Sequence, residues 1–370
     1  MQKKSDGQNY APRSQGKTVP VAAPGEFRVG VMALDHGHIY GMCNGLAEAG
    51  AEIALVWDPD PEKTLAFQKA FPQVRIARSR DEILENGDIR LIACAAVPGD
   101  RCDLGVAALR SGHDFFVDKP PLITREQLKQ AREAVWETGR KYGVYYSERL
   151  HVEAAVRAGE LLQEGAIGRV VQVMGWGPHR VGPVSGRPDW FFDKSRYGGI
   201  LVDIGCHQIE QILTFAGAEG ARIAHSRVAN FAHEEHPRFE DFGDVNLICD
   251  NGAAGYFRVD WFTPSGLGAW GDGRTLILGT EGYIEIRKYI DVASDAEGDH
   301  IYLADRKGEH HIRAAGTCGF PFFGRFIRDC LDRTEMAMTQ EHAFAAVELA
   351  IEAQERAWSS GTDGYRETGE

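Results

Sequence analysis

Asp203 and His207 form the residue pair in this sequence whose types and spacing best suit acid–base chemistry. They lie four residues apart within Gly198–His207, so a helix would place both side chains on one face. A carboxylate beside an imidazole orients the ring and favours its protonated form, which suits a general base near neutral pH. We therefore predict a catalytic role for the pair, with a purely structural hydrogen bond between them as the alternative.

A lysine occupies the second position at which chemistry is expected. Lys119 follows Asp118 and precedes Pro120, directly after an apolar stretch with the character of a buried strand. The residue before a proline is disfavoured in a helix, so Lys119 is expected at the carboxyl end of the strand, the edge where open α/β sheets bind ligands. A solvated loop lysine is the alternative.

A turn that could hold a dinucleotide follows the first expected strand and precedes a helical pattern. Such a turn uses glycines for the tight bend and for the close approach of the backbone to the pyrophosphate. Ala33 and Asp35 stand where the first two glycines are expected, and we predict that Asp35 either caps the following helix or faces away from the phosphates. The residues predicted to contact the cofactor here are Ala33, Leu34, Asp35, His36, Gly37 and His38.

Asp58 ends the second expected strand, roughly 20 residues after the turn, where an acidic residue accepts hydrogen bonds from the adenosine ribose. We find no cationic residue beside it in the sequence that would bind a 2′-phosphate, so NAD is favoured over NADP. A simple polar turn at Asp58-Pro59-Asp60 is the alternative.

Aspartate and histidine are also zinc ligands, so Asp35, His36 and His38 could instead belong to a metal cluster. The spacing supplies no further ligand to complete such a cluster, and a helix capped by Asp35 with solvated histidines is a further alternative. We predict that these residues lie close to the cofactor and that they bind no metal.

The elements that must position these residues alternate from Phe27 to Ser147. Unbroken apolar strands separated by helices indicate a doubly wound parallel sheet, covered by helices on both faces, of the nucleotide-binding type. The expected strands are Phe27–Met32, Glu52–Trp57, Val74–Ala77, Leu91–Ala96, Asp114–Val117 and Gly143–Ser147, and the expected helices are Ile39–Ala49, Pro61–Phe71, Arg101–Ser111 and Thr124–Thr138.

The pattern changes after Arg149, where strands follow one another without intervening helices. Such a succession indicates an antiparallel or mixed sheet. The expected strands are Arg169–Gly175, Arg222–Phe231, Asp241–Cys249, Ala253–Trp261, Thr275–Leu278 and Tyr283–Arg287, and the expected helices are Leu150–Glu164, one after Gly199, Pro321–Leu331 and Gln340–Ser359. His310-His311 is expected in a solvated loop or turn.

These patterns divide the chain into four parts. We expect a flexible N-terminal arm (residues 1–26), a dinucleotide-binding domain (27–148), a substrate-binding and oligomerisation α/β domain (149–360) and a flexible tail (361–370).

The composition limits the class of protein. A chain of 370 residues with 43% apolar and 26% charged residues is typical of a soluble globular protein of about two domains. The net charge of −13 argues against a nucleic-acid partner, and no stretch approaches the length of a membrane span. The seven cysteines are scattered without a CxxC pair, which is typical of reduced thiols in a cytoplasmic protein.

Taken together, the motifs resemble those of the glucose–fructose oxidoreductase/inositol dehydrogenase/rhizopine-catabolism (Gfo/Idh/MocA) family, from about Phe27 to Ser359. Asp118-Lys119-Pro120 is similar to the family's Glu-Lys-Pro motif, and Gly198–His207 matches its G-G-x-x-x-D-x-G-x-H motif without gaps. Asp189-Trp190 and Leu278–Gly282 are further similarities. The turn departs from the family pattern, because Ala33 and Asp35 replace glycines.

The resemblance implies a Rossmann domain followed by an α/β domain with a large, open, mostly antiparallel sheet that makes oligomer contacts, hence a homodimer or homotetramer. It also implies NAD(P)-dependent oxidation of a secondary alcohol of a sugar, cyclitol or related polyol. His207 would take the hydroxyl proton, Lys119 would stabilise the alkoxide, and Asp203 would hold His207 or a substrate hydroxyl. Further cofactor contacts are expected from Asp58, Val97, Pro98, Asp118 and Lys119.

Aromatic and polar residues around the segment 175–197 could line a sugar site, because sugar C–H groups pack on aromatic faces while polar side chains bind hydroxyls. Some of them could instead lie at a rim or a dimer interface. The residues expected to contact the substrate are Arg149, Trp176, His179, Asp189, Trp190 and Tyr197.

Two other functions fit the same motifs. One is a lyase or glycosidase that retains NAD and uses transient oxidation, and the other is a non-catalytic sugar or nucleotide sensor. Stoichiometric release of NADH would exclude the first, and an intact Lys119, Asp203 and His207 argue against the second.

Overall fold

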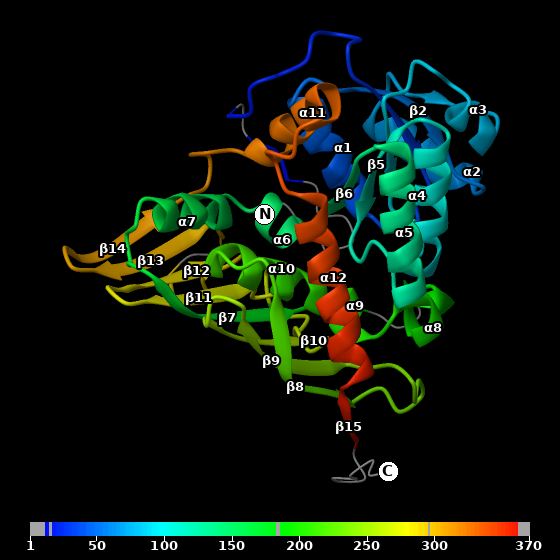
Figure 1. Cartoon of the computed structure of the whole chain (residues 1–370). Coiled ribbons are helices and arrows are strands. Elements are labelled where there is room, and N and C mark those ends of the chain that lie inside the picture. Colours follow the sequence, from blue (N-terminus) through cyan, green and yellow to red (C-terminus); the bar gives the residue numbers. More distant parts are fainter. Residues whose placement is uncertain (1–11, 15–16, 183–185, 295–296, 362–370) are drawn as a thin grey trace. The chain divides into compact units, whose positions relative to one another are not determined.

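The computed structural model describes residues 12–14, 17–182, 186–294 and 297–361, which belong to two compact units. The parallel-sheet unit comprises the described residues within 8–146 and 318–343, and the mixed-sheet unit comprises those within 147–317 and 344–370. Figure 1 labels the helices and strands of both units. Within the described residues, no helix is long and apolar enough to cross a membrane.

The parallel-sheet unit contains six strands in the order β3-β2-β1-β4-β5-β6, and every pair is parallel. This arrangement confirms the predicted doubly wound fold, and the reversal of strand order between β1 and β4 marks the edge where such sheets bind ligands. The strands are β1 (Arg28–Met32), β2 (Glu52–Trp57), β3 (Arg75–Ile76), β4 (Leu91–Cys94), β5 (Asp114–Asp118) and β6 (Tyr142–Tyr145).

Helices cover both faces of this sheet because successive side chains of a strand point to opposite sides. A Cβ atom at Gly105 would lie 2.7 Å from the rings of both Phe115 and Tyr142, so α4 packs closely on that face. Phe116 points the other way and packs on Phe326, with ring centroids 5.1 Å apart. The helices are α1 (His38–Glu48), α2 (Pro61–Ala70), α3 (Arg80–Leu84), α4 (Arg101–Arg110), α5 (Arg125–Thr138) and α11 (Pro321–Asp332), with a short 3-10 turn η1 (Pro98–Asp100).

Helix α11 comes late in the chain but belongs to the parallel-sheet unit. The expected domain, which ends at residue 148, does not include it. Glycines make room for it: a Cβ atom at Gly45 would lie 2.3 Å from the ring of Phe323, and one at Gly143 would lie 2.4 Å from the ring of Phe326. The described part of the expected N-terminal arm also packs on this unit, since the Val21 N–H donates to the carbonyl of Ala49 (2.9 Å). The expected tail comprises residues 361–370; its first residue, Gly361, ends a strand, and residues 362–370 lie outside the described residues.

The mixed-sheet unit contains a nine-stranded sheet in the order β14-β13-β12-β11-β7-β10-β9-β8-β15. Only the pairs β10–β7 and β15–β8 are parallel, which confirms the predicted, mostly antiparallel sheet. The strands are β7 (Val170–Pro178), β8 (Ala221–Asn230), β9 (Phe242–Cys249), β10 (Ala254–Asp260), β11 (Arg274–Gly279), β12 (Tyr283–Arg287), β13 (His300–Asp305), β14 (Gly308–Arg313) and β15 (Trp358–Gly361).

Helix α10 covers one face of this sheet (Figure 1). Gly175 and Gly177 on β7 leave room for the Gln208 side chain, which would lie 2.3 Å and 2.7 Å from Cβ atoms at these positions. The helical elements are α6 (Ser147–Leu150), α7 (Glu153–Gln163), η3 (Asp189–Phe192), α8 (Lys194–Tyr197), α9 (Ile200–Asp203), α10 (Gly205–Ala216) and α12 (Gln340–Glu355), which begins in the other unit.

The strands β13, β14 and β15 were not predicted. The prediction that His310 and His311 lie in a solvated loop or turn is wrong. His310 and His311 lie in β14, where His311 stacks on Tyr302 of the neighbouring strand with ring centroids 4.6 Å apart. The side chains of β14 are polar and exposed, so no apolar alternation marks it in the sequence. The last helix ends at Glu355, and Trp358–Gly361 pairs with β8 as a strand.

Candidate active site

The turn after β1 achieves its tight bend without the expected glycine. Ala33 adopts a positive φ of 59°, a conformation that glycine reaches at lower cost. The Leu34 N–H donates to the Asp58 carboxylate (2.6 Å), and Asp58 also accepts from the Asp60 N–H (2.8 Å). The structure therefore brings Asp58 to the turn, where it holds backbone groups.

Asp35 pairs with a cation that the sequence did not place there. Its carboxylate lies 2.6 Å from Lys63 Nζ, and helix α1, whose N-cap is Gly37, has no side-chain cap. Capping by Asp35, one of the two predicted arrangements, is therefore wrong. The premise that no cation lies beside Asp58 is also wrong, because Lys63 Nζ is 3.9 Å from Asp58 Oδ1. Lys63 escaped notice because it lies one helical turn into α2, away from the end of β2.

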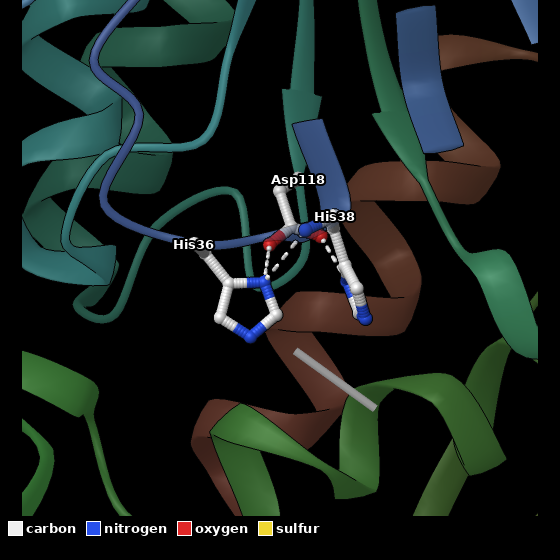
Figure 2. Close-up of side chains that lie close together, drawn as sticks. All are labelled: His36, His38 and Asp118. Carbon is white, nitrogen blue, oxygen red and sulfur yellow. Dashed lines mark hydrogen bonds and ion pairs between the residues drawn. The ribbon is translucent and has the colours of Figure 1, made fainter. Parts of the chain in front are cut away.

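Asp118 stands at the end of β5 and receives two histidines of the turn (Figure 2). Its oxygens lie 3.0 Å from His36 Nδ1 and 2.9 Å from His38 Nδ1. Arg101 Nη2 (3.1 Å) and the Lys119 N–H (2.8 Å) supply two more donors. We call Asp118, Arg101, His36 and His38 the aspartate cluster.

The aspartate cluster shifts the pKa values of Asp118 and His36. Burial opposes ionisation of Asp118, but His38, Arg101 and His36 outweigh it and hold the pKa of this carboxyl well below its ordinary value. Burial and the neighbouring His38 lower the pKa of His36 from 6.5 to about 4. His36 Nδ1 faces the Asp118 carboxylate (3.0 Å) and also lies 3.4 Å from the donating His38 N–H.

The structure supplies the third metal-ligand candidate that the sequence did not place, since His36, His38 and Asp118 come together. However, Arg101 already brings a buried positive charge to Asp118, and each carboxylate oxygen already accepts two hydrogen bonds. A divalent cation would have to displace these donors next to a guanidinium. The donor set therefore suits an ion-pair cluster better than a metal site.

Arg101 is a residue that the sequence analysis missed. It is buried at the start of α4, and its Nε donates to the Ala96 carbonyl (2.7 Å) while Nη1 donates to the carbonyls of Lys119 and Pro120. It thereby joins the chain around the predicted cofactor residues Val97 and Pro98 to the segment that carries Lys119. A single arginine at the start of a helix belongs to no motif of recognisable spacing. The signal that could have found it is its position shortly after β4.

In the mixed-sheet unit, the motif Gly198–His207 folds as the end of α8, then α9 and α10. Gly199 has a φ of 94°, and a Cβ atom there would lie 2.4 Å from the Gln354 side chain, so this position requires glycine. Asp203 is half-buried at the end of α9, and His207 is 1% exposed in the first turn of α10. The motif therefore sets the start of α10, which carries the candidate base.

A buried carboxylate that the sequence analysis missed lies near His207. Glu148 on α6 accepts through Oε2 from Lys288 Nζ and Gln208 Nε2, both at 2.8 Å. Its Oε1 lies 4.0 Å from Nε2 of the predicted substrate residue His179. Burial would raise the pKa of Glu148, but Lys288, His207 and His179 together hold it well below its ordinary value. We call Glu148, Lys288, His179 and His207 the glutamate cluster.

The other predicted substrate residues are not all brought to the glutamate cluster. Trp176 lies on the sheet face opposite to α10, between the guanidinium groups of Arg258 and Arg274, each 5.5 Å from its ring. Arg149 is bound to Glu210 (Nε to Oε1, 2.7 Å).

The remaining predicted substrate residues lie in η3 and α8. Tyr197 is buried and accepts from the Glu240 N–H at 3.2 Å. Trp190 is half-buried beside Phe191, and Asp189 is exposed. Burial in this way makes Tyr197 a support for the motif that follows it.

Both units match models of a single family. The oxidoreductase family with an NAD-binding Rossmann fold matches residues 29–146, and the GFO/IDH/MocA C-terminal domain matches residues 155–285. Together these matches cover more than half of the chain.

Solved and curated proteins show the same relationship. A protein of Erwinia carotovora atroseptica SCRI1043, provisionally described as an oxidoreductase, is 52% identical, with a TM-score of 0.87 over 90% of this chain and 99% of that one. Levoglucosan dehydrogenase, solved with NADH and levoglucosan, shares the fold at a TM-score of 0.65 and 18% identity, over 90% of this chain and 91% of that one.

The scyllo-inositol 2-dehydrogenase (NAD(+)) of Bacillus subtilis (strain 168) is 28% identical over 64% of this chain. This chain spans 66% of the length of that relative, just under two thirds, and 40% and 44% of the next two. With both units matched and half of the residues shared with a solved relative, the chain belongs to the GFO/IDH/MocA family of oxidoreductases, and its parallel-sheet unit is an NAD-binding Rossmann fold.

Proposed function

We propose that this protein is an NAD-dependent dehydrogenase that oxidises a secondary alcohol of a sugar, cyclitol or related polyol. The observation that carries the proposal is the buried His207 at the start of α10, held in a motif of this family and followed by Gln208, whose side chain donates to the buried Glu148 carboxylate (2.8 Å). The relative that acts on scyllo-inositol and the neighbour solved with levoglucosan support a polyol-like substrate.

In this proposal, His207 takes the proton of the reacting hydroxyl. Lys119 stabilises the negative charge that develops on the oxygen, and Asp203 holds His207 or a neighbouring substrate hydroxyl. The nicotinamide, when bound, supplies the acceptor for the hydride that leaves the same carbon. Lys119 is buried at the end of β5, the edge of a parallel sheet where ligands bind.

The residues of the turn fit a dinucleotide despite the missing glycines. Ala33 keeps the tight bend, and the charge of Asp35 is compensated by Lys63. The first backbone N–H groups of α1 donate at long distances, from His38 to His36 Nδ1 (3.4 Å), from Ile39 to the His36 carbonyl (3.3 Å) and from Tyr40 to the Gly37 carbonyl (3.2 Å), and a bound phosphate would compete for these weak bonds. The proposal keeps the residues predicted to contact the cofactor: the turn from Ala33 through His38, together with Asp58, Val97 and Pro98.

NAD is favoured over NADP for a revised reason. Lys63 could attract a 2′-phosphate, but it is engaged by Asp35 at 2.6 Å and lies 3.9 Å from Asp58. Two carboxylates beside one ammonium leave a net negative charge, which repels a further phosphate. Titration with both dinucleotides should show weaker binding of NADP.

We also propose that the protein forms a homodimer or homotetramer through the sheet face opposite to α10. This face exposes several large apolar side chains, each between 36% and 46% exposed: Trp176, Ile248, Leu278 and Tyr283. Large apolar side chains exposed on one sheet face are typical of an interface. Light scattering of the purified protein, and of Trp176→Glu, tests this part of the proposal.

The test of the activity is a panel of cyclitols and sugars, scyllo-inositol and levoglucosan included, with NAD and continuous measurement of NADH absorbance. We expect NADH in equal amount to the oxidised product. Conversion of a substrate without NADH release would instead indicate a cofactor-retaining lyase or glycosidase. NAD binding without conversion of any member would contradict the proposed dehydrogenase.

A further inference from the structure

The glutamate cluster unites charged residues from distant parts of the chain. Glu148 lies on α6, Lys288 follows β12, His179 follows β7, and His207 lies on α10. Glu148 is 1% exposed and Lys288 is 2% exposed, so neither charge is solvated by water. A buried ion pair of this kind does not by itself argue for stability, because the desolvation of two charges offsets their attraction.

The two oxygens of Glu148 are unequally used. Oε2 accepts from Lys288 and Gln208 at 2.8 Å and from Gln211 Nε2 at 3.5 Å. Oε1 is buried and has no hydrogen-bond partner among the residues that the structure describes. His179 Nε2 lies 4.0 Å from this oxygen. A buried carboxylate oxygen without a donor is costly, so a role for it is expected.

We propose that Glu148, held in place by Lys288, is a positioning residue that stabilises the positive charge on His207 when this histidine takes up a proton. With both imidazoles neutral, Glu148 and Lys288 cancel each other. Gln211 Nε2 donates both to the His207 carbonyl (2.9 Å) and to Glu148 Oε2 (3.5 Å), so the carboxylate lies beside the first turn of α10. A proton on His207 adds one positive charge to this buried site, and the negative charge of Glu148 offsets it. Glu148 thus acts on His207 through charge and does not touch the reacting atoms.

Four other carboxylates on elements around α10 have partners of their own or lie on the far face. Glu210 on α10 is bound to Arg149 of α6, and Glu153 of α7 binds the Gly316 N–H. Asp260 of β10 pairs with Arg258, and Asp244 of β9 pairs with Arg227 at 2.7 Å. Asp203 at the end of α9 is half-buried and is the one other carboxylate of the proposed active site in this unit.

The charges of Glu148 and Lys288 predict shifts of opposite sign in the pKa of His207. Glu148→Gln removes the negative charge and should lower this pKa by about one unit, whereas Lys288→Met should raise it by a similar amount. The double variant should return it close to the wild-type value. Packing defects alone would not produce opposite shifts that cancel.

The experiment is an NMR titration of the full-length protein labelled with ¹³C at histidine Cε1, in which His207→Asn identifies the His207 signal. Asp244→Asn, which removes a charge on the opposite face of the sheet, is the matched control and should leave the signal unchanged. If Glu148→Gln does not fold, Glu148→Asp, which withdraws the oxygen but keeps the charge, should give a smaller shift downwards. Shifts of the same sign in the two single variants, or no shift in any Glu148 variant, would overturn the proposal.

The catalytic part of this inference rests on the proposed dehydrogenase, but the titration needs no substrate. Where a polyol is oxidised, the acid limb of kcat/KM against pH should move with the NMR pKa in each variant. Opposite shifts without turnover of any polyol would refute the dehydrogenase and leave the charge pair standing. Turnover without the shifts would do the reverse.

Discussion

The aspartate cluster and the glutamate cluster have the same ingredients: one buried carboxylate, one buried cation and two histidines. In the parallel-sheet unit, Asp118 accepts from Arg101 and from both imidazoles directly, within 3.1 Å. In the mixed-sheet unit, Glu148 binds Lys288 directly, whereas His179 Nε2 lies 4.0 Å from the carboxylate.

The clusters differ in how many hydrogen bonds their carboxylate oxygens accept. Every acceptor position of Asp118 is used, so its histidine rings are held in one orientation. Glu148 keeps one buried oxygen without a hydrogen bond among the described residues. A carboxylate whose acceptor positions are all used holds its neighbours in place and has a structural role. A carboxylate with an oxygen left over can stabilise a positive charge that forms nearby.

Asp118→Asn should break the aspartate cluster with the largest effect on stability. The substitution keeps the shape but leaves the Arg101 guanidinium buried without a countercharge, which costs about 3–5 kcal/mol in the free energy of unfolding. Urea unfolding followed by circular dichroism measures it. The control Asp88→Asn removes an exposed partner of Arg28 and should change stability by less than about 0.5 kcal/mol. Equal stability of the two variants would contradict the scaffold role.

The pH dependence of stability should reveal His36. Its pKa is about 4 in the folded chain against 6.5 ordinarily, so the unfolded chain takes up the proton first as the pH falls, and about 3 kcal/mol is lost between pH 6.5 and 4. That contribution is fully present above pH 6.5. His36→Asn should flatten the curve of unfolding free energy in this window, and superimposable curves would be incompatible with a neutral His36.

Asp35→Asn should change the choice of cofactor at the edge of the same unit. It releases Lys63 from its 2.6 Å partner, so NADP binding should improve up to about tenfold while NAD binding changes little. Fluorescence titration with both dinucleotides measures the ratio. Asp35→Asn combined with Lys63→Met should lose the gain, and a steep loss of NAD binding in Asp35→Asn would show instead that Asp35 contacts the cofactor.

Ala33→Gly should have the smallest effect. Relief of the positive φ outweighs the backbone entropy of glycine by about 0.5–1 kcal/mol, so the variant should be slightly more stable. Ala107→Gly, inside α4, should instead lose about 1 kcal/mol. Thermal unfolding of both variants checks the opposite signs, and a destabilised Ala33→Gly would show that the turn is not strained.

The sequence predicted the fold best where apolar periodicity carries it. The six parallel strands and the start of the mixed sheet follow from alternating apolar segments, and they are confirmed. β14 and β15 were not predicted because they are short and polar and show no apolar pattern of their own. Pairing with the neighbouring strands holds them in place.

The clusters could be predicted only in part. His36, His38, Asp118 and His207 lie in motifs, whereas Arg101, Glu148 and Lys288 are single charged residues far from their partners. Lys288 is 140 residues from Glu148, and no local spacing connects them. The position of Glu148 just after a buried parallel strand was the one signal available, since that edge of the sheet carries ligands.

His207→Ala tests the proposed catalytic role most directly. In a dehydrogenase assay with a polyol that the wild-type protein oxidises, turnover should fall about a hundredfold or more. The NAD dissociation constant should stay within about threefold, since His207 belongs to the mixed-sheet unit and the phosphate turn to the parallel-sheet unit. Wild-type turnover in His207→Ala would contradict this role, and it would transfer the base function to Lys119 and leave the glutamate cluster a structural feature.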